Sequence, residues 1–194
     1  MQRRSSVSSW SSRPPRRLWR SISFPLFAGV VVVQGTHVFE HIVQLIQVFA
    51  LGIPDEEALG LLGYVFQFQG TEEWLHLVFN VTYLLTLYAL LLPLRNLTPG
   101  RVPDWAFATF AVGAVGLESW HVVEHAVIIS NVIRNNGYPC PGIGDAALGL
   151  SDKVLHFGYN AAAYASTLPA FWYVVRARWV GRPLLLATRR GDVT

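Results

Sequence analysis

Four long apolar runs restrict the fold of this chain more than any other feature of its sequence. They extend over about 22–51, 73–94, 105–132 and 154–176. Each is long enough to cross a bilayer, which takes about 20 predominantly apolar residues in a helix. Inside hydrocarbon every backbone amide and carbonyl must find its partner within the segment, so runs of this length are expected to be helical. The pattern predicts an all-α integral membrane protein, a bundle of four transmembrane helices.

Composition indicates the same class of protein. Of the 194 residues, 52% are hydrophobic and 14% are charged, whereas charged residues make up about 25% of an average soluble domain. The net charge of +3 does not indicate nucleic acid, because the basic residues lie in the tails and at the ends of the apolar runs. The single cysteine, Cys140, excludes an internal disulfide framework and a thiolate-rich metal site. We expect the lipid bilayer as the partner, and no nucleic acid.

The distribution of Lys and Arg predicts the orientation. Thirteen of the fifteen basic residues lie in the two tails and in the connection between the second and third runs. The first connection has none, and the third has Arg134 and Lys153. By the positive-inside rule, both termini are cytoplasmic, and the first and third connections lie outside the cell membrane. The predicted domains are a disordered basic tail at 1–21, a membrane domain at 22–176 and a cytoplasmic tail at 177–194.

The two halves of the chain repeat the same polar residues in the same order. His-x-x-Glu-His occurs at 37–41 and again at 121–125, an offset of 84 residues. In the second and fourth runs, EEWLHLVFN at 72–80 aligns with DKVLHFGYN at 152–160, an offset of 80. Each half has two spans, so the halves share an orientation and are related by a pseudo-twofold axis along the membrane normal. The tandem two-helix repeats are predicted at about 22–94 and 105–176.

All six histidines of the chain belong to this repeat. Because a helix turns about 100° per residue, the polar residues of each His-x-x-Glu-His motif share one stripe. Polar residues spaced by four in the second and fourth runs also share a face. A charged side chain at the bilayer centre costs at least ~2.5–3.5 kcal/mol, so the four stripes are expected to meet inside the bundle. Their distance from the outer helix ends, at 1.5 Å per residue, predicts a site in the outer half of the membrane.

The residue types in these stripes indicate a metal site. Two histidines at i and i+4 present two ring nitrogens to one ion, and His-x-x-Glu-His resembles the inverzincin zinc motif. Glu-x-x-His, beginning at Glu73 and at Glu118, resembles the pairs of di-iron carboxylate bundles, although Glu73 corresponds to Lys153 in the second repeat. These resemblances imply a mononuclear or dinuclear centre. The candidate ligands are His37, His41, Glu72, His76, Glu118, His121, His125, Asp152 and His156.

Nitrogen and oxygen ligands suit zinc, iron or copper, and some of the carboxylates could instead orient histidine rings from behind. We expect metal-dependent oxidation first and hydrolysis second, with Glu40 or Glu124 as the general base in a hydrolase.

Three alternatives remain open at this stage. The first is a b-type haem ligated by repeat-related histidines, with quinone as electron partner. The second is proton or ion conduction, for which a homo-oligomer would supply further spans. The third is a polar bundle without a cofactor. The substrate stays open.

Overall fold

In the computed structural model, regular structure throughout the described part of the chain is helical, which confirms the predicted all-α class. Cys140, the residues before Arg16 and those after Val180 lie outside this part. The described residues are 16–66, 72–97, 102–136 and 141–180.

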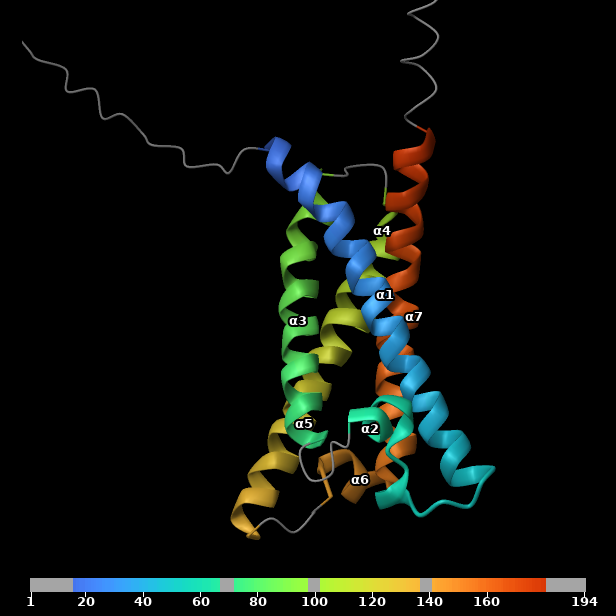
Figure 1. Cartoon of the computed structure of the whole chain (residues 1–194). Helices are drawn as coiled ribbons and strands as arrows, with labels where there is room; N and C mark the ends of the chain where they lie inside the picture. The colour runs from blue at the N-terminus through green and yellow to red at the C-terminus, as the bar shows by residue number, and fades with distance from the viewer. Residues whose placement is uncertain (1–15, 67–71, 98–101, 137–140, 181–194) are drawn as a thin grey trace, which may run out of the picture.

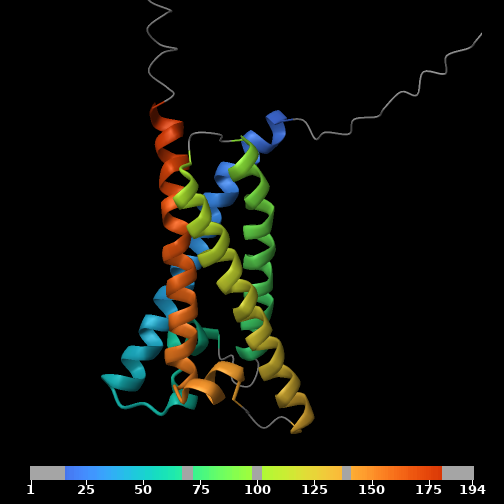
Figure 2. The same cartoon turned by 180° about the vertical axis from the view of Figure 1, so that it is seen from behind.

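Four long helical segments run side by side (Figures 1 and 2). α1 (Arg16–Phe49) begins within the segment predicted as a disordered tail, because Arg and Leu at its start are good helix formers. α3 (Glu72–Leu97) and α7 (Asp152–Val180) are the second and fourth segments. The third is continuous through α4 (Asp104–Ala108), η2 (Thr109–Gly116) and α5 (Leu117–Arg134). The short helices between them are η1 (Asp55–Glu57), α2 (Gly60–Phe66) and α6 (Ile143–Leu148).

Three helices are long and apolar enough to cross a membrane, namely Ser23–Phe49, His76–Asn96 and Asp104–Arg134. They correspond to the first three predicted spans. The fourth predicted span, 154–176, lies within α7 and is helical, but it is not among the helices that reach this length and apolarity.

The long helices pack both between and within the two halves of the chain. α1 packs mainly against α7 and α3 packs against α5, while the third segment also packs extensively against α7 through η2, and contacts of α1 with α3 complete the bundle. The start of α1 and the end of α7 lie at one end, and α2 and α6 lie at the other (Figure 1). The two ends of the described part of the chain therefore lie at the same end of the bundle.

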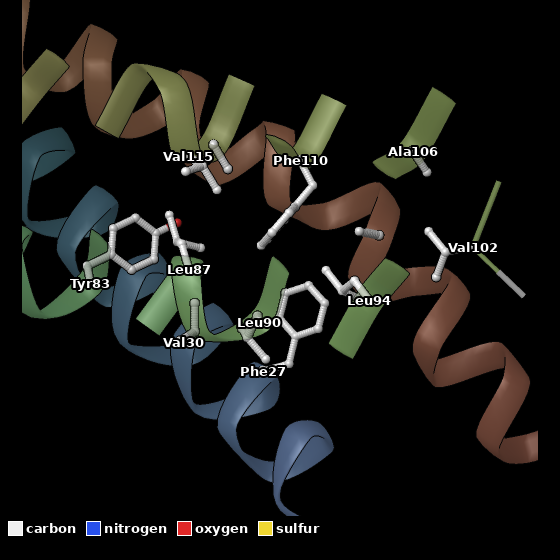
Figure 3. Packing of buried hydrophobic residues seen from close by; sticks show 12 residues of the cluster. Phe27, Val30, Tyr83, Leu87, Leu90, Leu94, Val102, Ala106, Phe110 and Val115 are labelled. Carbon is white, nitrogen blue, oxygen red and sulfur yellow. The ribbon is translucent and has the colours of Figure 1, made fainter. Parts of the chain in front are cut away.

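The core of the bundle has two parts of opposite chemistry. In the half nearest α4, buried apolar side chains from α1, α3, the third segment and α7 pack together (Figure 3), with Phe27 edge-on to Phe110 at a ring-centroid distance of 5.7 Å. In the half nearest α2 and α6, most of the buried side chains are polar, although Ile128, Ile129 and Leu155 are buried there too. These polar residues are Gln34, Glu40, His41, Gln44, Asn80, Glu118, His121, Glu124, His125, Lys153, His156 and Asn160.

The outer surface of the bundle is rich in large apolar side chains. A soluble bundle would bury such side chains and leave the histidines and carboxylates in water. The reverse distribution suits a helix bundle in lipid. Examples of these exposed side chains are Val32, Phe39, Leu85, Leu92, Val112, Val123 and Trp172.

Candidate metal centre

Six histidines from all four long helical segments form one cluster in the half of the bundle nearest α2 and α6. Seven ring pairs among them have centroid distances from 4.5 to 5.8 Å. The structure therefore brings together every histidine that the sequence predicts as a ligand. The cluster consists of His37 and His41 on α1, His76 on α3, His121 and His125 on α5, and His156 on α7.

The three histidines of the second repeat form a group that could hold one metal ion. His121, His125 and His156 are buried, and each offers a ring nitrogen that lies within 4.8 Å of the other two. Nε2 of His125 lies 3.1 Å from Nε2 of His121. Two nitrogens bound to one tetrahedral zinc at 2.0–2.1 Å would be about 3.3 Å apart. The pair on α5 already has this spacing, and α7 supplies the third nitrogen.

Carboxylates lie behind two of these rings rather than between them. Asp152 Oδ1 is 2.8 Å from Nδ1 of His156, and the backbone oxygen of Asp152 is 2.9 Å from the same nitrogen. Glu118 Oε2 is 3.6 Å from Nδ1 of His121. A hydrogen-bond acceptor at Nδ1 fixes the ring and leaves Nε2 for a metal. Asp152, predicted as a candidate ligand, thus occupies the position of a ring-orienting group. Glu118, also a predicted ligand, lies near Nδ1 of His121 without a hydrogen bond to it.

The histidines of the first repeat have a similar but looser arrangement. Nε2 of His41 is 3.2 Å from Nε2 of His37, and their ring centroids are 4.7 Å apart. The His76 ring lies 5.6 Å from that of His37 and 5.8 Å from that of His41. Behind His41, Gln44 Oε1 accepts a hydrogen bond at 2.8 Å from Nδ1. In this half the group that orients the His41 ring is therefore a neutral amide.

Each Glu of the two His-x-x-Glu-His motifs reaches the backbone of a short helix at the same end of the bundle. Glu40 Oε1 accepts the amide hydrogen of Leu62, in α2, at 2.6 Å. Glu124 Oε1 accepts that of Gly144, in α6, at 2.7 Å. The first four amides of a helix lack partners within it, and a carboxylate is a good acceptor for them. The role of general base, predicted for both residues, stays a prediction.

Gly60 and Gly142 allow this close approach. A Cβ at Gly60 would overlap Glu40 Oε1, and one at Gly142 would overlap Glu124 Oε1. Gly60 also has a φ of +73°, which an L side chain rarely adopts. The sequence analysis did not identify these two glycines, although each lies where the connection returns to the bundle.

Buried carboxyl groups are concentrated around the cluster. Glu118 and Glu124 are completely buried, and both oxygens of Glu118 and Oε2 of Glu124 have no hydrogen-bond partner among the described residues. The Lys153 Nζ, which is also buried, lies 4.0 Å from Asp152 Oδ2. Buried carboxylates are stable as anions only beside positive charge. A bound metal cation would supply this charge.

An amide chain links the two halves of the site. Gln34 Nε2 donates to Asn160 Oδ1 at 2.8 Å, and Asn160 Nδ2 lies 3.1 Å from His41 Nε2.

The side chain of Glu72, another predicted ligand, lies outside what the structure describes.

Lys153 was predicted to lie in an outer connection, whereas the structure buries it beside Asp152. Its position one residue after Asp152, within one turn of His156, was the available signal.

No protein-family model, curated protein or solved structure matches this chain.

Proposed function

We propose that this chain is a four-span membrane metalloprotein built from two tandem parallel repeats, with a metal ion held by His121, His125 and His156 in the outer half of the membrane. The observation that carries this proposal is the convergence of three buried ring nitrogens within 4.8 Å of one another. Three protein ligands, rather than four, is the pattern of catalytic metal sites.

Corresponding contacts in the two halves support the duplication. The Nε2 atoms of the histidine pair are 3.2 Å apart on α1 and 3.1 Å apart on α5. The Glu of each motif holds the backbone of the short helix that follows. A pseudo-twofold axis that exchanges α1 with α5 and α3 with α7 also exchanges the α1–α7 packing with the α3–α5 packing.

The membrane location and the orientation rest on surface chemistry and charge. The apolar outer surface and the three apolar helices support insertion. α7 is the fourth span of the proposal, since it packs against both α1 and η2. The excess of Lys and Arg in the tails supports cytoplasmic termini and an outer position for α2 and α6.

Several contacts favour metal-dependent oxidation over hydrolysis. The Oε1 atoms of Glu40 and Glu124 are engaged by backbone amides, which leaves these residues less suited to activating a water. The Tyr159 ring lies 5.3 Å from the His121 ring, and its hydroxyl accepts a hydrogen bond at 3.0 Å from Trp120 Nε1. Both aromatic side chains are oxidisable and adjoin the site. We therefore propose an oxidoreductase, with iron or copper as the redox metal; zinc would indicate the hydrolase.

Packing around the cluster argues against two alternatives. The six rings contact one another, which favours ions over a haem, since a macrocycle would have to separate them. Toward α4, the apolar core around Phe27 and Phe110 follows the polar region, and both side chains are buried. This packing disfavours a polar path for protons or ions across the bundle.

The test is elemental analysis and an absorption spectrum of the full chain, purified in detergent without a His tag. We expect at least one equivalent of iron, copper or zinc and no Soret band. The double variant His121→Ala, His125→Ala should lose this metal. Ser119→Ala is the matched control, because the Ser119 hydroxyl on the same helix bonds to the backbone of Val115. A wild-type protein that neither contains nor takes up these metals would contradict the proposal, and a Soret band would favour haem.

A further inference from the structure

We propose that His37, His41 and His76 form a second metal site, so that the centre is dinuclear and binds two divalent first-row transition-metal ions with unequal affinity. This inference rests on the proposed function, because both sites belong to one cluster. Site one is the triad of His37, His41 and His76, and site two is the triad of His121, His125 and His156.

Two of the three rings of site one have the spacing of metal ligands. The 3.2 Å between the Nε2 atoms of His37 and His41 is the spacing of two ligands of one ion. The His37 ring stacks on Phe79 at a centroid distance of 4.3 Å, and the Gln44 side chain accepts a hydrogen bond from Nδ1 of His41. Both rings are thereby oriented by groups that do not compete for Nε2. His76 completes the triad from α3.

The two sites are neighbours. The His76 ring of site one lies 5.6 Å from the His125 ring of site two. Two cations bound in adjoining triads repel each other in a low-dielectric interior. Occupation of one site therefore weakens binding at the other, and the second ion binds more weakly than the first.

Among the described residues, carboxyl groups adjoin the rings of site two. Asp152 accepts a hydrogen bond from His156, and a carboxyl oxygen of Glu118 lies 3.6 Å from Nδ1 of His121, so that carboxylates at these places would favour a cation. In site one, the neutral amide of Gln44 accepts a hydrogen bond from His41. Sequence alignment of the repeats also places Gln34 where the second repeat has Glu118.

Asn160 is a second feature that lowers the metal affinity of site one. Its Nδ2 lies 3.1 Å from His41 Nε2, the atom that would bind the metal, while its Oδ1 accepts a hydrogen bond from Gln34. A metal entering site one has to displace this amide donor. Site two is therefore the tighter site, and Asn160 sets part of the difference between the two affinities.

The experiment is a titration of the metal-stripped full chain in detergent with Zn²⁺ in the presence of a competing chelator. Wild type should take up two equivalents, the second at least tenfold more weakly than the first. The double variant His37→Ala, His41→Ala should lose only the weak equivalent. His121→Ala, His125→Ala should lose the tight one.

Asn160→Asp tests site one without removing a ligand. The carboxylate keeps an acceptor for Gln34 but no longer donates to His41 Nε2, so the weak equivalent should tighten about tenfold or more. Cu²⁺ provides a second signal, since electron paramagnetic resonance should detect a spin-coupled pair in fully loaded wild type and an isolated Cu²⁺ ion in each double variant.

The failure of this inference differs from the failure of the proposed function. A single equivalent that is lost in His121→Ala, His125→Ala but retained in His37→Ala, His41→Ala would overturn the second site and leave the proposed function intact. No uptake by wild type would overturn both. A weak equivalent unchanged by Asn160→Asp would overturn the role of Asn160.

Discussion

Glu124 is expected to fasten α6 to the bundle, and its replacement by Ala should open this helix locally. The carboxylate is completely buried, and its Oε1 accepts the amide hydrogen of Gly144 at 2.7 Å. Ala would remove the acceptor and leave a buried donor without a partner. Losing a hydrogen bond to a charged group costs ~1.5–3 kcal/mol, and an unpaired buried donor costs a similar ~1–3 kcal/mol. Both figures describe the loss of the same hydrogen bond, so they are not added, and we expect a total cost of about 2–3 kcal/mol.

The measurement is amide hydrogen exchange of the segment around α6 in detergent, which reports local opening. A loss of about 2–3 kcal/mol corresponds to exchange roughly 30- to 150-fold faster at Gly144 in Glu124→Ala. Glu124→Gln keeps an oxygen acceptor and should change exchange far less. Glu40→Ala is the matched variant in the first repeat, where the affected amide is that of Leu62.

Two results would refute this reasoning. Unchanged exchange at Gly144 in Glu124→Ala would mean that the contact does not hold α6. Equal effects of the Ala and Gln variants would mean that the carboxyl group itself, rather than any hydrogen-bond acceptor at this position, holds α6. That result would favour the predicted role of Glu124 as a general base.

Three further predictions concern packing, metal and pH. Gly113→Ala should destabilise the bundle by ~1–3 kcal/mol, because the new Cβ would lie 2.7 Å from Cβ of Ser166 and overlap its hydroxyl. Gly29 is at the repeat-related position, and a Cβ there would have no neighbour within 4 Å, so Gly29→Ala should stabilise α1 by ~0.5–1 kcal/mol. An unfolding temperature that falls equally in the two variants would contradict this. Removing metal by chelation should lower the unfolding temperature, by the equivalent of about 2.7 kcal/mol if metal was present at 100 times its Kd, and should have little effect in His125→Ala. Burial, and then the charge of Asp152, raise the pKa of Asp145 in α6 above its usual value, so the protection of α6 amides against hydrogen exchange, relative to their intrinsic exchange rates at each pH, should fall as pH rises through that pKa, and Asp145→Asn should abolish this fall.

The long helices and their inward faces were predictable from the sequence, because both follow from local rules. An apolar run in lipid has to satisfy its own backbone, so it forms a helix wherever it lies. The cost of exposing His or Glu to hydrocarbon requires the His-x-x-Glu-His stripes to face inward. These two rules alone predicted that all six histidines would meet, and His121, His125 and His156 do lie together in the structure.

Which residues contact one another within the site depended on the tertiary structure. The sequence does not determine how far α1 is rotated or shifted relative to α7, and this decides that Asn160 meets His41. Nor does it determine that Asp152 and Glu118 lie behind the rings, since a shift of one helical turn would place them between the rings. The eight residues of π-helix in η2, directly before α5, change the rotation of the helix that carries Glu118, and helical periodicity cannot predict that change.

The sequence by itself determined which residues enter the interior, because solvation in lipid acts on each side chain separately. Only the tertiary structure decided which of them become neighbours, because neighbours depend on the packing of four helices and the return path of two short ones. Glu40 and Glu124 show the difference most clearly. Their spacing within the motif suggested chemistry, whereas their contacts with the backbones of α2 and α6 arise only when the connections fold back onto the bundle.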